Sequence, residues 1–112
     1  IFKQMKYHAH IYWTSEFEKE IALGLRIPLH NNKCGLGKIH DTQVGPHNFP
    51  MYQVSYDDSN KNFVEAFLKT HRNGLSILLH KITKEGDLYD HTFGARWLGN
   101  KLKLNLEIFE EE

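Results

Sequence analysis

The chain has 112 residues, and its 14 Lys and Arg balance 14 Asp and Glu, so the formal net charge at pH 7 is zero. This length suits one domain spanning residues 1–112, and an apolar fraction of 40% excludes a disordered chain. The balanced charge excludes a broad electrostatic attraction to nucleic acid, and no apolar run approaches the roughly 20 residues that cross a membrane. Together with a single cysteine, Cys34, these features predict a cytoplasmic protein that binds neither nucleic acid nor membrane.

The first predicted elements are a strand at residues 6–13 and a helix from residue 16 to the region of Pro28. The side chains of the strand alternate, so that one face carries Tyr7, Ala9, Ile11 and Trp13 and the other carries His8, His10 and Tyr12. Ser15 followed by Glu18 forms a capping-box pattern, and the apolar residues that follow recur at helical spacing.

Two further strands are predicted in the middle of the chain. Residues 30–38 are rich in Asn and Gly, which predicts a loop, and residues 38–44 are compatible with a short strand. Gly45 and Pro46 then interrupt the chain before residues 51–56, where alternation predicts a third strand.

The second half of the chain contains one predicted helix and two predicted strands. Apolar residues from Phe63 onward follow an amphipathic pattern that ends near Asn73 and Gly74. Residues 74–80 alternate and predict a fourth strand, whereas residues 81–99 show no regular pattern. Residues 101–109 alternate leucine and isoleucine with polar residues, which predicts a fifth, terminal strand.

The resulting order βαββαβ is typical of a ferredoxin-like α+β sandwich, here with an additional C-terminal strand. In this fold both helices cover one face of an antiparallel sheet, and we expect them to cover the face of Ala9 and Ile11. His8, His10, Tyr12 and His80 then lie on the opposite face. Such a mixed face is usually covered by a second subunit or by extra segments such as residues 81–109, so we expect a homodimer.

Histidine is the unusual residue of this sequence, with eight copies in 112 residues. His8 and His10 share one face of a predicted strand, about 7 Å apart at the Cβ atoms. Three further histidines, His47, His80 and His91, can converge with them. Neutral imidazole is a common ligand of zinc and iron, so the sequence predicts a metal site, with Asp41, Asp87 or Asp90 as candidate carboxylate ligands.

Each of these residues also has a purely structural interpretation. A half-exposed polar sheet face explains His8 and His10, a turn hydrogen bond explains His47, and a loop cap explains His91. His30, His40 and His71 have no partner on a matching face and are expected at the surface. Tyr12 and Tyr52 fit packing as well as substrate orientation, and Arg96 fits either a substrate carboxylate or a surface ion pair.

Four segments of the sequence resemble the DOPA 4,5-dioxygenase family in their order and spacing. They are HAHIYW at 8–13, VGPHNFPMYQVSY at 44–56, RNGLSILLH at 72–80 and DHTFGARWLG at 90–99. The resemblance spans nearly the whole chain. Asn48 and Lys81 stand where the family commonly has proline, and His8 stands where many members have an acidic residue.

The resemblance implies a small ferredoxin-like protein that opens a catechol ring beside its hydroxyls with iron(II) and dioxygen, although zinc or another divalent metal is also compatible with such a site. Carried over by position, the family's histidines are His10, His47, His80 and His91. We expect iron to be held by His10, His47 and His80. His91 or His8 is then expected as the general base, and Tyr12, Tyr52 and Arg96 as residues that orient or bind the substrate.

Two other classes of function are compatible with the sequence. The first is a ferredoxin-fold dimer without catalysis, whose histidines line a pocket for an aromatic ligand or a metal. The second is a structural or regulatory module in which the changes at Asn48 and Lys81 have disabled the site.

Overall fold

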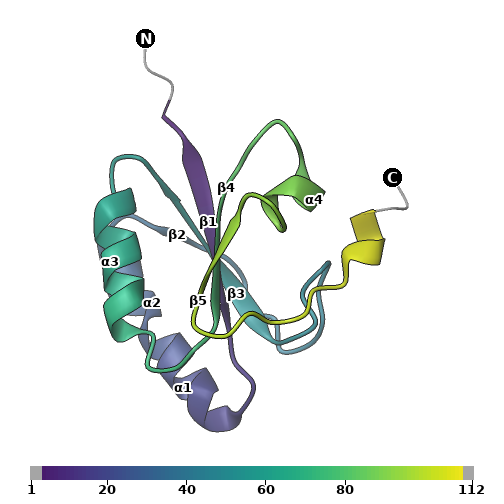
Figure 1. Ribbon diagram of the computed structural model, residues 1–112. Helices are drawn as coiled ribbons and strands as arrows, with labels where there is room; N and C mark the ends of the chain where they lie inside the picture. The colour runs from purple at the N-terminus through teal and green to yellow at the C-terminus, as the bar shows by residue number, and fades with distance from the viewer. Residues whose placement is uncertain (1–3, 110–112) are drawn as a thin grey trace.

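A five-stranded antiparallel sheet organises the chain in the computed structural model, which describes residues 4–109 (Figure 1). The strands follow the order β2-β3-β1-β4-β5. Their bounds are Lys6–Tyr12 for β1, Gly35–Leu36 for β2, Met51–Asp57 for β3, Ile77–Lys81 for β4 and Ala95–Leu98 for β5. The first four strands have the ferredoxin-like order, as predicted, and β5 extends the sheet beyond β4.

Helices cover one face of the sheet (Figure 1). These are α1 at Glu16–Gly24, α2 at Arg26–Asn31 and α3 at Lys61–His71. The short helix α4 at Asp87–Asp90 and the 3-10 helix η1 at Leu106–Phe109 lie on the other side of the sheet. The main core forms between the sheet and the first three helices, from the face of β1 that carries Ala9 and Ile11.

The predicted single helix at residues 16–28 is two helices in the structure. The side chain of Ser15 accepts a hydrogen bond from the backbone N–H of Glu18 at 3.1 Å, so the predicted cap is confirmed. The first helix, α1, ends at Gly24, and α2 begins at Arg26 and continues through Pro28 to Asn31. Pro28 is tolerated because it is the third residue of α2, in the first turn, where backbone N–H groups have no partner within the helix.

The predicted strand at residues 38–44 is wrong. The partner of β3 at this edge is the two-residue strand β2, inside the segment that was expected to be a loop. Of residues 38–44, His40 forms an isolated bridge with Met51 and Val44 forms one with His47. Gly45, with a φ of +55°, lies in the tight turn between Val44 and His47.

The additional strand exists, but it lies at Ala95–Leu98 and not at residues 101–109. Gly99 ends β5 with a φ of +77°, and a Cβ atom there would lie 2.9 Å from the carbonyl oxygen of Leu75. In the segment that follows, Leu104 forms an isolated bridge with His47, and the chain then enters η1. The alternating leucines mark packing on the sheet and not a ladder of hydrogen bonds.

The face of the sheet that carries the histidines has its own small core. Tyr12, Met51 and Leu78 are buried there, and the side chains that pack on them come mainly from β5 and the C-terminal segment, including Ala95, Trp97, Leu102 and Leu104. Segments of the same chain therefore cover part of this face, which was one of the two expected ways to cover it. Among the described residues, no helix has the length and apolar character that crossing a membrane requires.

We predict that Leu68→Ala in α3 lowers the free energy of unfolding by about 2–5 kcal/mol, because Leu68 is fully buried in the main core. The matched control is Leu88→Ala in α4, where the leucine is 45% exposed and a loss below about 1 kcal/mol is expected. Urea unfolding of both variants measures the difference. Equal losses would contradict the placement of the core.

Candidate metal centre

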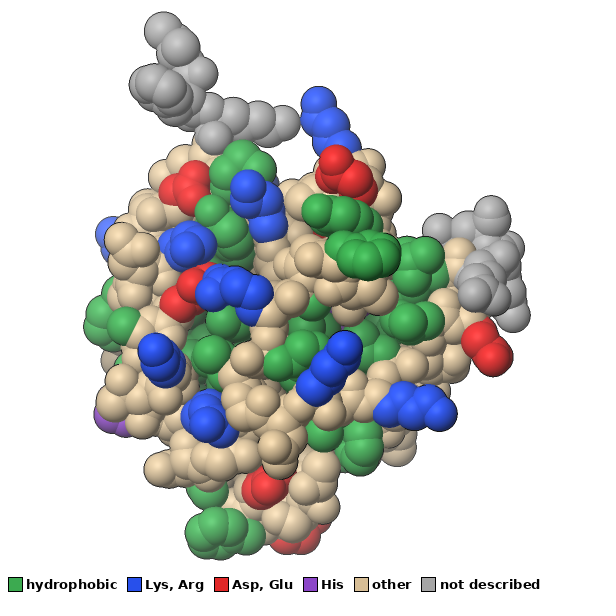
Figure 2. All heavy atoms as spheres, in the orientation of Figure 1, with side chains coloured by type: hydrophobic (Ala, Val, Ile, Leu, Met, Phe, Trp, Pro, Cys, Tyr) green, Lys and Arg blue, Asp and Glu red, His purple; other side chains and the backbone are tan. Residues whose placement is uncertain are grey.

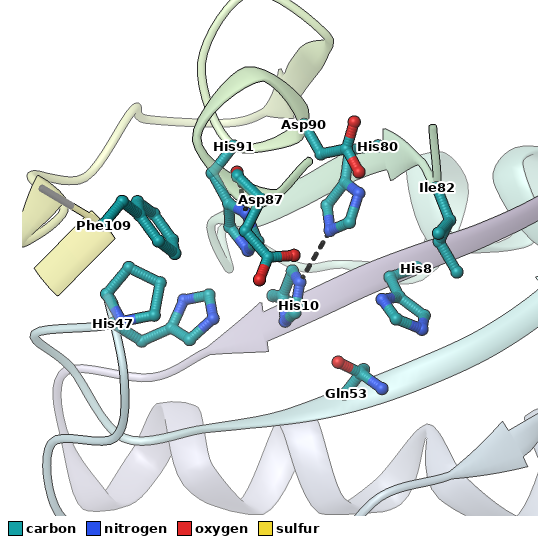
Figure 3. Close-up of a pocket in the computed structure, with 11 residues that line it drawn as sticks. His8, His10, His47, Gln53, His80, Ile82, Asp87, Asp90, His91 and Phe109 are labelled. Atoms are coloured by element: carbon teal, nitrogen blue, oxygen red, sulfur yellow. Dashed lines mark hydrogen bonds between the residues drawn. The ribbon is translucent and has the colours of Figure 1, made fainter. Parts of the chain in front are cut away.

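Five histidines from separate parts of the chain meet in one cavity of about 230 Å³ (Figure 3). They are His8 and His10 of β1, His47 of the turn before β3, His80 of β4 and His91 directly after α4. The structure thus brings together all five imidazoles that the sequence singled out.

Strand geometry brings three of these rings to the same face. His8 and His10 share a face because they are two residues apart on β1, and His80 of β4 lies directly opposite His8 in the register. His47 reaches the same region because its backbone bridges both Val44 and Leu104. The rings of His10 and His47 are 4.4 Å apart, and those of His80 and His91 are 4.6 Å apart.

Two overlapping triads have suitable spacing for one metal ion. His10 combines with His8 and His80 in the first triad and with His47 and His91 in the second. Within each triad, one potential ligand nitrogen of every residue lies within 4.8 Å of the others. The set expected from the sequence, His10, His47 and His80, is divided between these triads, and His10 belongs to both.

Hydrogen bonds fix which ring nitrogens are free. His91 Nδ1 lies 2.8 Å from the carbonyl oxygen of Asp87, and His80 Nδ1 lies 3.1 Å from that of Lys81. A carbonyl oxygen only accepts, so both Nδ1 atoms carry the proton and both Nε2 atoms carry a lone pair.

The contact with His80 also places the proton of His10, because His10 Nε2 lies 3.0 Å from His80 Nε2. Because His80 Nε2 accepts, His10 Nε2 donates, and the lone pair of His10 is then on Nδ1. His10 Nδ1 is buried and has no hydrogen-bond partner among the described residues. A buried lone pair without a partner is costly, and a metal ion would satisfy it, so the residues present fit a bound metal.

Burial favours the neutral form that metal binding needs. Desolvation, followed by the neighbouring histidines, lowers the pKa of His8 to about 4 and that of His47 to about 3. The pKa values of His10 and His80 are lowered for the same leading reason. At neutral pH these four residues, His8, His10, His47 and His80, therefore offer uncharged imidazoles.

The three candidate carboxylates have different surroundings. Asp90 is buried, but its two oxygens accept hydrogen bonds from the backbone N–H of Thr83 at 3.1 Å and from the Thr83 hydroxyl at 2.5 Å. Asp90 thus holds the chain between β4 and α4 in place. Asp41 pairs with Lys19 away from the cavity, whereas Asp87 and Asp90 both line it.

The remaining predicted site residues lie in different places. The Tyr12 hydroxyl is 2.7 Å from His47 Nδ1, so Tyr12 orients this ring at the edge of the cluster. Tyr52 lies on the opposite, helix-covered face of the sheet, where its hydroxyl donates to the carbonyl oxygen of Ala22. Arg96 pairs with Glu65 of α3 at 2.7 Å. Tyr52 and Arg96 therefore do not line the histidine cavity.

Sequence reasoning missed several other residues of the cavity wall, among them Gln53, Ile82 and Phe109. Alternation within residues 51–56 contained the signal for Gln53, which lies opposite His10 in the register of β1 and β3. No pattern in the sequence predicted Phe109 at the cavity. Phe109 ends η1, and its ring lies 5.6 Å from that of His91. Outside the cluster, His30 and His71 are exposed as expected, whereas His40 is half-buried.

The sequence matches a known protein family. Residues 7–108 match the Dopa 4,5-dioxygenase family, a range that includes all five histidines of the cavity. The chain belongs to this family. It is 29% identical over 111 residues to the DOPA 4,5-dioxygenase of Amanita muscaria, with 93% of this chain covered, and spans about half, 48%, of that relative's length.

A solved structure shares the fold of this family member. It is the crystal structure of a protein from Nostoc punctiforme that is described as a candidate dioxygenase. The two chains are 32% identical, the match covers 96% of this chain and 92% of that chain, and the TM-score is 0.89. The likeness shows that this chain and that protein share one fold.

We predict that acid destabilises the metal-free protein between about pH 6.5 and 4. In this range the unfolded chain protonates its histidines near their ordinary pKa of about 6.5, whereas the folded chain keeps His8 and His47 neutral down to about 4 and about 3. The unfolded state thus binds more protons in this range, so the free energy of unfolding decreases as the pH decreases. Urea unfolding at pH 7, 6, 5 and 4 measures the free energy of unfolding. His47→Gln should make its dependence on pH less steep. An identical dependence in the variant and the unmodified protein would refute the lowered pKa of His47.

We predict that His10→Ala weakens Fe(II) and Zn(II) binding by at least about a hundredfold, because His10 belongs to both triads. The control is His30→Ala, which removes an exposed histidine from α2 and should leave the affinity unchanged. Metal titration with a competing chelator measures both. Equal affinity in the two variants would place the metal elsewhere.

Proposed function

We propose that this chain is a metal-dependent dioxygenase that opens the ring of a catechol beside its two hydroxyls, which is extradiol cleavage. The observation that carries this proposal is the convergence of five imidazoles in one cavity of the family fold. Imidazole ligands suit iron(II), and a site held by few protein ligands leaves room for a small molecule and dioxygen. The physiological partners would thus be a catechol and dioxygen.

We assign His10, His47 and His91 as the residues that hold the metal. All three are buried and form one of the two triads. The Nδ1 atoms of His47 and His91 are engaged by Tyr12 and by the Asp87 carbonyl, which leaves each Nε2 for the ion. His80 instead uses its Nε2 to accept from His10. This assignment exchanges His80 of the expected set for His91.

When bound, the ferrous ion would supply the chemistry by binding the catechol oxygens and dioxygen and by lowering the pKa of the catechol. The remaining task of the chain is to move protons and to orient rings. His8 is half-buried, lines the cavity and forms no hydrogen bond with another described residue, so its ring is free to accept a proton from a catechol hydroxyl. Tyr12 acts as a positioning residue through His47.

The proposal is tested by anaerobic reconstitution with Fe(II), followed by a catechol in air. We expect a yellow ring-opened product and about one dioxygen consumed per ring. His8→Ala should keep its iron and lose turnover by about 10²–10⁴-fold, whereas His10→Ala should lose the iron itself. His30→Ala is the control for both properties.

Two outcomes would contradict the proposal. Stoichiometric iron without oxygen uptake for any catechol would favour a binding module over an enzyme. Unchanged turnover of His8→Ala would show that His8 does not accept the proton. If His8→Ala loses its iron and His47→Ala retains it, the metal is held by the triad of His8, His10 and His80.

A further inference from the structure

A separate cavity of about 570 Å³ lies where β1 ends and α1 begins. Binding sites for small molecules commonly measure about 300–1,000 Å³, so this cavity has a suitable size. Its apolar wall comes from Trp13, Phe49 and Pro50, and its polar rim includes Glu16, Lys19 and Asp41. It shares no lining residue with the histidine cavity, so a ligand bound here is independent of the proposed function.

Contacts between the chain after β1 and the chain before β3 fix the walls of this cavity. The backbone N–H of Trp13 donates to the carbonyl oxygen of Pro50 at 3.2 Å. The ammonium of Lys19 in α1 pairs with Asp41 at 2.8 Å, and Phe49 packs on the small core of the histidine face. The cavity is therefore a built feature of the fold.

Trp13 places a hydrogen-bond donor without a partner in this cavity. Trp13 is 4% exposed, and its indole N–H forms no hydrogen bond with another described residue. Among the described residues, His10 Nδ1 is the one fully enclosed side-chain nitrogen or oxygen that lacks a partner. The indole N–H is therefore not enclosed, and the open space that Trp13 lines is this cavity. A buried indole N–H usually has an acceptor, so this donor points to an oxygen atom of a ligand.

The rim of the cavity carries excess negative charge. The hydrogen bond with Asp41, together with the charges of Asp41 and Glu16, raises the pKa of Lys19, so two carboxylates already surround this one ammonium. Glu18 accepts hydrogen bonds from Thr14 and adds a further negative charge in the same turn. The two glutamates more than offset the partial positive charge, about half a unit, at the start of α1. Figure 2 shows Asp and Glu side chains beside apolar ones at the lower end of the molecule, where α1 begins in Figure 1.

We propose that this cavity binds a small aromatic amine that carries a carbonyl group. The aromatic ring fits the wall formed by Trp13, Phe49 and Pro50. The carbonyl oxygen accepts from the indole N–H of Trp13, and the ammonium lies beside Glu16, which forms no ion pair with another described residue. A carboxylate in place of the ammonium is disfavoured, because it would approach Glu16 and Asp41.

The test is an NMR titration of the ¹⁵N-labelled chain with 4-(aminomethyl)benzamide, which combines the ring, the ammonium and the carbonyl group. The chain has two tryptophans, so its spectrum contains two indole N–H signals, and Trp13→Phe identifies which one belongs to Trp13. We expect the signal of Trp13 to move to lower field, because its N–H gains an acceptor. The signal of Trp97 should stay, because Trp97 lines a different cavity.

Two related compounds and two variants separate the contributions. Benzylamine lacks the carbonyl group and 4-(hydroxymethyl)benzamide lacks the charge, and we expect each to bind at least about threefold more weakly. Glu16→Gln should remove the preference for the amine over the alcohol. The matched control is Glu20→Gln, which removes an exposed carboxylate of α1 that does not line the cavity and should keep the preference.

An unmoved Trp13 signal at roughly 10 mM ligand, which would occupy most of a site with a millimolar Kd, would overturn the inference. Movement of the Trp97 signal alone would also overturn it, because the ligand would then lie beside β5. Equal affinities for the amine and the alcohol would contradict the ligand class, and loss of the preference in Glu20→Gln would contradict a contact with Glu16. These measurements involve neither metal nor oxygen uptake, so their failure would leave the proposed function intact.

Discussion

The alternation of side chains along β1 is the constraint on which the rest of the structure depends. Ala9 and Ile11 point into the main core, whereas His8, His10 and Tyr12 point to the opposite face. β1 pairs with both β3 and β4, so its register fixes what lies beside each histidine. A shift of one residue would bury the histidines under the helices and expose the apolar residues.

Burial of imidazoles gives this face its chemical character. The protein places His10 almost out of contact with water and leaves its Nδ1 without a partner among the described residues, an arrangement that costs stability unless something binds there. Burial, followed by the neighbouring rings, lowers the pKa of His10 and His47, so these two imidazoles stay neutral and offer lone pairs. A metal ion bound among these rings would satisfy the lone pair of His10 Nδ1.

The periodicity of the sequence predicted which side chains share a face of the sheet. It did not predict the positions that depend on tertiary contacts. Alternation placed His8, His10 and His80 on one face, and the helices on the other. The same alternation in residues 101–109 was wrong as a strand, because Leu102 and Leu104 pack on the open face without a partner strand. The positions of Arg96 and Phe109 depend on where β5 and η1 lie, which no local pattern records.

We expect one metal ion to bind at His10. A crystal structure of the Fe(II)-loaded protein, with anomalous diffraction measured on both sides of the iron absorption edge, would locate the ion. We predict one iron peak in contact with His10, His47 and His91, inside the cavity that the five histidines line. An iron peak away from His10, or none in protein shown to be loaded with iron, would contradict it.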